Sequence, residues 1–139
     1  MKTWDNSLLT VLGSTTYDAD PIKPAPTHHL IIITRTPEKY KDDEVMGQLE
    51  FTCESPSQLV ARYRESGLTQ MLVAGGSQLA TSFLRAQLID ELWLTIEPKI
   101  FGTGKNLVAN EDMDIDLKLI SVEQANEQGT LMIKYAVIK

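Results

Sequence analysis

Two short apolar runs that each end in glycine constrain the fold of this chain more than any other feature. Residues 8–12 and 71–74 are mainly apolar, and each run is followed by glycine and then by hydroxyl side chains. This order predicts a strand that turns on glycine and opens a helix with Ser or Thr at its cap. The N-terminus of such a helix presents backbone N–H groups to an anion, and glycine lets the anion come close. Two such junctions on neighbouring strands predict a site for the two phosphates of a dinucleotide.

The predicted phosphate-binding residues are those of the two glycine turns. They are Gly13, Ser14, Thr15 and Thr16 in the first glycine turn, and Gly75, Gly76, Ser77 and Gln78 in the second. The same residue types also punctuate strand–helix junctions that bind nothing, so a purely structural role is the alternative. A G-x-G-x-x-G fingerprint is absent, and residues 99–106 fail as a P-loop because Lys99 and Asn106 replace its first Gly and its Ser or Thr.

Composition limits the classes of protein to which the chain can belong. With 139 residues, 42% of them hydrophobic, we expect a single domain over residues 1–139. The net charge of −6 argues against nucleic-acid binding. Cys53 is the only cysteine, which excludes an internal disulfide and favours a reducing compartment. No apolar run approaches a membrane span and no signal-peptide pattern opens the chain, so we expect a cytoplasmic protein without a membrane partner.

Residues for metal binding or covalent catalysis are not evident. His28 and His29 are adjacent, and no third His or second Cys completes a zinc site, so we predict no metal and a structural or solvent-facing role for both. The sequence also lacks a credible Ser-His-Asp or Cys-His constellation. No catalytic residue is therefore assigned.

Alternation, β-branched residues and turn signals predict seven strands, at residues 8–12, 29–34, 48–53, 71–74, 92–98, 115–122 and 130–138. The first, second and fourth are short and apolar, as expected of strands buried on both faces. Ser55-Pro56 predicts the start of one amphipathic helix, and Ser77 that of another. Surface loops are expected at residues 18–21, 24–26 and 37–44.

The order of these elements predicts an α/β fold. Strands and helices alternate in the first two thirds, which favours a largely parallel sheet with helices on both faces. In the last third of the chain, alternating and apolar residues on both sides of residues 126–129 predict an antiparallel hairpin. We therefore expect three layers around one mixed, mainly parallel sheet that ends in a C-terminal antiparallel hairpin.

Residues 71–108 resemble the C-terminal reductase domain of bacterial riboflavin-biosynthesis deaminase-reductases, which has the dihydrofolate reductase fold. The shared tokens are Gly75-Gly76, Leu84, Asp90-Glu91-Leu92, Pro98, Gly102 and Gly104. Upstream, residues 12–17 are similar to the Gly-x-x-Thr turn of that superfamily, and residues 30–35 to its next strand. The resemblance covers nearly the whole chain.

The resemblance implies NADPH as the cofactor, with its pyrophosphate between the two glycine turns. It places Thr34 and Arg35 where such proteins bind the adenosine 2′-phosphate; the alternative is a polar strand end that faces water. Asp90 and Glu91 are expected to face solvent, and Lys105 is a possible contact for a substrate phosphate. The implied reaction is hydride transfer from the nicotinamide to a polarised C=N or C=O group of a small heterocyclic substrate.

Two departures from the family pattern weaken the enzymatic interpretation. Family members begin with a strand, a loop and a helix before the first glycine turn, whereas only residues 1–7 precede the first predicted strand here, so the domain is expected to be N-terminally shortened. The missing strand would lie between the strands at residues 71–74 and 92–98. Three alternatives follow: these two strands pair directly, another chain supplies the strand, or the protein is a shortened relative that no longer catalyses. In addition, Ala74 stands where riboflavin-pathway reductases usually have Glu.

Two functions of different classes therefore stay open. One is an NADPH-dependent reductase. The other is a non-catalytic binding or assembly module that has lost the walls of its nicotinamide and substrate sites. Exposed strand edges and the C-terminal hairpin predict a homodimer in both cases.

Overall fold

The computed structural model describes residues 8–21, 23–24, 29–67, 70–109 and 112–139. Its strands are β1 (Leu8–Gly13), β2 (His29–Ile33), β3 (Leu49–Thr52), β4 (Gln70–Gly75), β5 (Glu91–Ile96), β6 (Leu117–Gln124) and β7 (Leu131–Val137). Its helices are α1 (Ser14–Ala19), α2 (Pro56–Glu65), α3 (Ser77–Arg85) and the 3₁₀ helix η1 (Pro37–Asp43). None of the helices in this part of the chain is long and apolar enough to cross a membrane.

Each of the seven predicted strands is present, with ends that differ by at most two residues from the predicted ones. The expectation of a loop over residues 37–44 is wrong, because η1 occupies most of it and buries Tyr40. The sequence gives no periodic signal for this helix, because Tyr40 is its one buried residue and most of its neighbours are charged. The predicted loop at 18–21 begins two residues late, since α1 continues to Ala19. Part of the predicted loop at 24–26 lies outside the described residues, as does His28.

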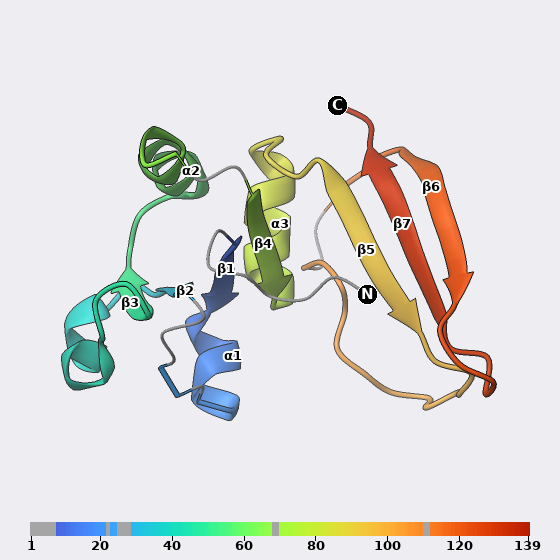
Figure 1. Cartoon of the computed structure of the whole chain (residues 1–139), viewed down its shortest axis with the longest axis horizontal. Coiled ribbons are helices and arrows are strands. Elements are labelled where there is room, and N and C mark those ends of the chain that lie inside the picture. Colours follow the sequence, from blue (N-terminus) through green and yellow to red (C-terminus); the bar gives the residue numbers. More distant parts are fainter. Residues whose placement is uncertain (1–7, 22, 25–28, 68–69, 110–111) are drawn as a thin grey trace.

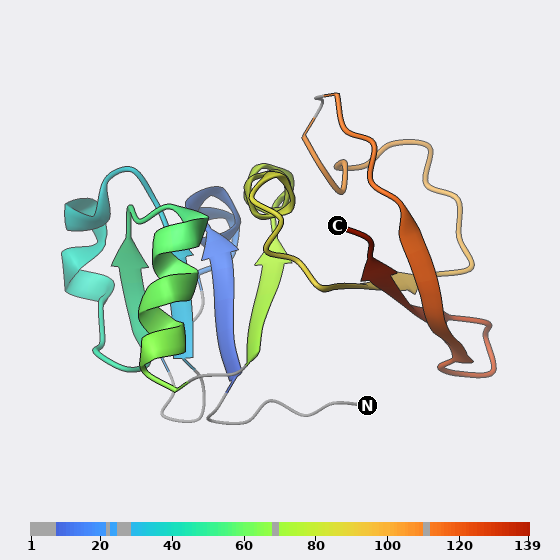
Figure 2. The same ribbon diagram turned by 90° about the horizontal axis from the view of Figure 1, so that it is seen from above.

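The strands form two sheets that lie side by side (Figures 1 and 2). The parallel sheet has the order β3-β2-β1-β4, and the antiparallel sheet has the order β5-β7-β6. The α/β fold class and the C-terminal antiparallel strands are thus as predicted. The single mixed sheet of the prediction is instead divided, because β4 pairs only with β1 and β5 pairs only with β7 among the described residues.

The division between β4 and β5 changes how deeply β4 is buried. The side chains of β1 are buried from Leu9 to Leu12, whereas none of those of β4 is fully buried. The prediction that this fourth strand is buried on both faces is therefore wrong, because one of its edges has no neighbouring strand in the described chain. Direct closure of β4 against β5 is likewise contradicted by the strand order.

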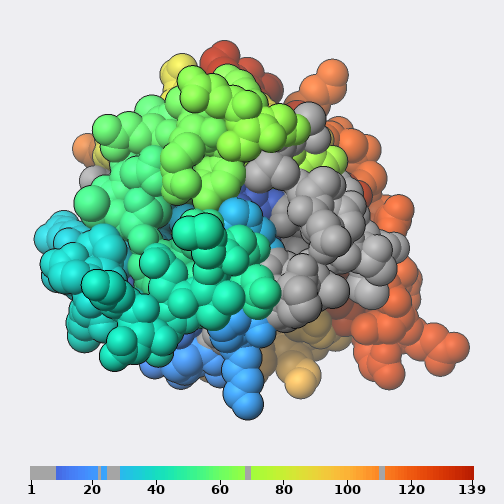
Figure 3. All heavy atoms as spheres, turned by 60° about the vertical axis from the view of Figure 1, so that its left-hand side comes forward, coloured from blue at the N-terminus to red at the C-terminus, as the bar shows by residue number. Residues whose placement is uncertain are grey.

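Apolar side chains cover both faces of the parallel sheet. On one face, Leu9, Val11 and Ile31 pack with residues of α2 and α3, including Leu59 and Phe83. A second cluster joins the sheet to α1 and η1; it consists of Leu12, Tyr17, Leu30, Ile32, Tyr40, Leu49 and Phe51. Figure 3 shows α2 and the segment from η1 to β3 at the surface of this end of the molecule. The helices on the two faces thus hold the parallel sheet in place, and the predicted site lies at the C-terminal ends of β1, β2 and β4.

Candidate functional site

The structure brings the two glycine turns together. β1 and β4 are parallel neighbours, and a register shift after Val11 pairs Leu12 with Gly75. A Cβ atom added to Gly13 would lie 3.9 Å from both the Gly75 carbonyl oxygen and the Gly76 nitrogen. Gly75 has a φ of +127°, which side-chain-bearing residues rarely adopt, so glycine is required at this position. The two glycine turns therefore lie next to each other on neighbouring strands, as predicted.

Both turns open helices whose N-termini lack a side-chain cap. The N-cap residues are Gly13 for α1 and Gly76 for α3, and neither first turn contains an acidic residue. The expectation of Ser or Thr at these caps is wrong, because Ser14 and Ser77 are already the first helical residues. α2 differs, since Ser55 accepts a hydrogen bond from the Gln58 backbone and completes a capping box. Two uncapped helix ends thus lie side by side, where backbone N–H groups can bind an anion.

The hydroxyl and amide side chains predicted for the site surround the two turns. Thr15, Thr16 and Gln78 are exposed, and Ser14 and Ser77 are partly buried. A Cβ atom on Gly76 would lie 3.4 Å from the Thr16 Oγ1 atom, so the two turns are in contact across a narrow space. The arrangement offers short polar groups on both sides of that space.

Thr34 and Arg35 lie at the same edge of the parallel sheet. Gly13 pairs with Ile33, the residue directly before Thr34. Thr34 is buried, its N–H donates to the Thr52 carbonyl oxygen at 2.9 Å, and its Oγ1 accepts from the Thr36 N–H at 3.2 Å. The side chain of Arg35 is exposed. Thr34 therefore shapes the strand end, and Arg35 is the cation that this end presents to solvent.

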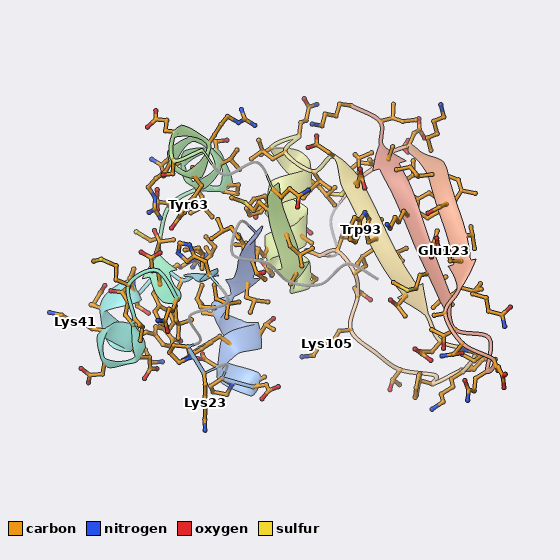
Figure 4. The ribbon with its side chains drawn as sticks, viewed as in Figure 1. Lys23, Lys41, Tyr63, Trp93, Lys105 and Glu123 are labelled. Carbon is orange, nitrogen blue, oxygen red and sulfur yellow. The ribbon has the colours of Figure 1, made fainter. Side chains whose placement is uncertain are left out.

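The connection from β5 to β6 is fastened to α3 close to this edge. The Thr81 Oγ1 atom donates to the Ser77 carbonyl oxygen and accepts from the Ala109 N–H, both at 2.7 Å. Lys105 belongs to the same connection and projects on the side of the ribbon where β4 and β5 end (Figure 4). Thr81 was missed by the sequence analysis, because its partner is 28 residues away and no local pattern signals that contact.

Two further polar networks join the elements of the parallel sheet. On one face, the His29 ring and the Tyr63 hydroxyl both contact the Glu50 carboxylate, the latter at 3.1 Å. Burial and the charge of Glu50 raise the pKa of Tyr63 to about 12. On the other face, Tyr40 donates to both carboxylate oxygens of Asp18, at 2.8 and 3.0 Å, which raises the pKa of Tyr40. Both networks have structural roles, as expected for His29.

Asp90 and Glu91 face solvent, as expected. The Asp90 carboxylate pairs with Lys139 at 2.6 Å, and the Glu91 carboxylate accepts from the Trp93 indole N–H at 2.7 Å. Ala74 is exposed directly before the second glycine turn. A cavity of about 360 Å³ lies at the other end of α3, between Leu84, Arg85, Ile89 and Val137. It is therefore separated from the glycine turns by the length of α3, roughly 13 Å.

Comparison with known proteins finds one matching family model and two similar proteins of Bacillus subtilis. A family model described as the RibD C-terminal domain matches residues 6–131. The uncharacterized protein YwjB of Bacillus subtilis is 26% identical over 118 residues, which cover 82% of this chain and 66% of YwjB. YyaP of the same organism is 27% identical over 93 residues, which cover 67% of this chain and 49% of YyaP. The matched region thus spans about two thirds and half of these two relatives.

Solved structures share the fold. A putative riboflavin biosynthesis protein from Shewanella sp. PV-4 superposes with a TM-score of 0.73 at 19% identity, covering 94% of this chain and 74% of that one. A pyrimidine reductase-like protein from Corynebacterium diphtheriae superposes with a TM-score of 0.71 at 14% identity, covering 94% and 76%. Each superposition includes 94% of this chain and therefore spans both sheets.

Proposed function

Because the chain belongs to the family of RibD C-terminal domains, we propose that it binds NADPH across the two glycine turns and reduces a small heterocyclic or carbonyl- or imine-bearing substrate. The observation that carries this proposal is the pair of adjacent, uncapped helix N-termini at Gly13 and Gly76. Their backbone donors and dipoles favour negative charge, and no acidic side chain in either first turn competes for them.

The described residues fit a pyrophosphate group. The helix N-termini supply backbone donors, and the Thr16 hydroxyl lies beside Gly76. Arg35 is the guanidinium that would bind the 2′-phosphate in a two-point contact, which is the feature that separates NADPH from NADH. When bound, the cofactor supplies hydride from its nicotinamide ring. The chain then contributes binding and orientation, and we assign no side chain as acid or base.

The alternative is a binding or assembly module without catalysis. The separation of β4 from β5 supports it, since one side of the second glycine turn borders a break between the two sheets. Ala74 adds to this case, because it supplies neither charge nor a hydrogen bond to a substrate beside that turn. Under this alternative the glycine turns serve only to connect strands and helices.

Titration of the purified chain with NADPH tests the proposal, with nicotinamide fluorescence and the thermal midpoint as readouts and NADH as the comparison. We expect saturable binding that favours NADPH, and loss of that preference in Arg35→Ala. Gly76→Ala is expected to raise the dissociation constants of both NADPH and NADH by at least about tenfold. The added Cβ atom would occupy the space between the turns where, in this proposal, the phosphates bind.

The matched control is Arg64→Ala, which removes the same charge from the last turn of α2. α2 leads from the end of β3 to the start of β4, so its last turn lies towards the ends of the strands opposite to the glycine turns. This variant should leave both affinities unchanged. Absence of saturable NADPH binding at millimolar concentration contradicts the reductase proposal and favours the module. Saturable binding justifies a screen of reducible heterocycles, in which NADPH oxidation is followed by absorbance.

A further inference from the structure

The C-terminal end of α3 is closed by a left-handed residue that is not glycine. The Leu88 N–H donates to the Phe83 carbonyl oxygen at 3.1 Å. The Gln87 N–H donates to the Leu84 carbonyl oxygen at 3.0 Å, which completes the Schellman pattern of a helix C-terminus. Gln87 takes the left-handed position of this motif with a φ of +58°. Glycine usually holds that position, because a Cβ atom makes the conformation costly. The fold therefore carries the Gln87 side chain at a cost in stability.

Gln87 lines the cavity of about 360 Å³ at this end of α3. Figure 1 shows the turn from α3 to β5 and the C-terminal end of β7 at the same end of the molecule. Two backbone hydrogen bonds fasten the walls: the Val137 N–H donates to the Asp90 carbonyl oxygen at 2.9 Å, and the Ile138 N–H to the Asp116 carbonyl oxygen at 3.0 Å. The walls are thus held in place without a ligand, and the volume lies at the lower end of the range for small-molecule sites.

The cavity has an apolar floor and a polar rim. Residues 112–115 show the division, because the exposed Asp112 and Asp114 alternate with the partly buried Met113 and Ile115. The partly buried side chains that make up the floor are Leu84, Ile89, Met113, Ile115 and Val137. A ligand that fits has an apolar body and carries its polar groups at one end.

The rim carries both signs of charge. Among the described lining residues, Arg85 and Lys139 are the cations and Asp112 and Asp114 the anions, so the charges balance. Lys139 donates to the Asp90 carboxylate at 2.6 Å, and Arg85 to the Asp112 carbonyl oxygen at 3.5 Å. A guanidinium has five N–H donors, so it can bind a carboxylate while it keeps a protein partner. A balanced rim attracts an ion of one sign only weakly, whereas a zwitterion meets both signs.

We propose that this cavity binds a free α-amino acid with an aliphatic side chain. Arg85 binds the carboxylate, the rim aspartates accept from the ammonium group, and the Gln87 amide adds a hydrogen bond. The aliphatic side chain packs on the apolar floor. The proposal holds whether or not the glycine turns bind NADPH, because Gly76 and the cavity lie at opposite ends of α3.

Calorimetric titration of the purified chain tests the ligand class, with L-leucine, L-isoleucine, L-valine and L-methionine as probes. We expect saturable binding of at least one of them. Analogues of the tightest binder that lack the amino group, the carboxylate or the side chain should bind at least about tenfold more weakly. For leucine these analogues are isocaproate, isoamylamine and glycine. No saturable binding of any of the four amino acids at millimolar concentration overturns the proposal, and so does an analogue that binds as tightly as its amino acid.

Gln87→Gly separates ligand binding from a structural role. Glycine relieves the left-handed conformation, so we expect the thermal midpoint to rise above that of the unmodified protein. The same variant should bind the amino acid at least about tenfold more weakly, because it lacks the amide. A residue with only a structural role would change the midpoint and leave the affinity as it was, and this result contradicts the proposed site.

Arg85→Gln is expected to lose saturable binding. Arg64→Gln is the matched control, since it removes the same charge from the last turn of α2 and should keep the affinity unchanged. Circular dichroism verifies that each variant is folded; if Arg85→Gln does not fold, Asp114→Asn replaces it with the same expectation. Binding that survives in the folded rim variant, or is lost in folded Arg64→Gln, overturns the proposal.

Discussion

Tyr63 is the residue whose ionisation the fold changes most clearly. Its pKa is raised to about 12, first by burial and then by the Glu50 charge. In the unfolded chain a tyrosine ionises near pH 10. Between these two pH values the folded state retains a proton that the unfolded state has lost, so the contribution of Tyr63 to stability is complete below pH 10 and decreases as the pH rises towards 12.

Tyr63→Phe therefore reduces the alkaline loss of stability. We expect the free energy of unfolding to fall less steeply between pH 10 and 12 in this variant than in the unmodified protein. Urea unfolding at a series of pH values measures the difference. Parallel curves for the two proteins would show that the hydroxyl remains near its ordinary pKa.

Thr81 is the residue that fastens the β5–β6 connection to α3. Thr81→Val preserves the shape of the side chain but leaves the Ala109 N–H without its acceptor. We expect a loss of about 1–3 kcal/mol in the free energy of unfolding, measured in urea. Ser82→Ala is the control, because the Ser82 hydroxyl donates only within α3, to the Leu79 carbonyl oxygen. Equal losses for the two variants would contradict a special role for Thr81.

At the scale of the element, the helices differ in how they begin. Ser55 caps α2 in a reciprocal box with Gln58, whereas Ser77 lies inside α3 behind a glycine cap. Ser55→Ala should therefore cost about 1 kcal/mol, and Ser77→Ala less than about 0.5 kcal/mol. Thermal unfolding followed by circular dichroism compares the two variants. A larger loss for Ser77→Ala would mean that its hydroxyl, rather than an anion, satisfies the start of α3.

At the scale of the whole molecule, the break between the two sheets sets the pattern of local stability. β1 has a strand on each side, whereas β4 has a strand only on the β1 side among the described residues. We expect every interior amide of β1 to be protected from hydrogen exchange, but only alternate amides of β4, those directed towards β1. Amide exchange followed by NMR measures this. Uniform protection along β4 would show that its second edge is paired.

Local pattern was sufficient to locate the strands and the two glycine turns. Alternation and apolar runs located all seven strands, and glycine after an apolar run located both turns, because these signals depend on neighbouring residues only. The same reasoning misplaced the caps of α1 and α3. It also read residues 37–44 as a loop, since one buried Tyr40 among charged residues carries no periodic signal.

The sequence by itself determined which segments become strands, where the chain turns on glycine, and the α/β class. Only the tertiary structure decided that β4 and β5 remain apart, that the two glycine turns touch, and that β6 leaves its apolar side chains exposed. The physical reason is that the side-chain period of a strand is a local property, whereas strand pairing and burial depend on contacts between residues that are far apart in the chain.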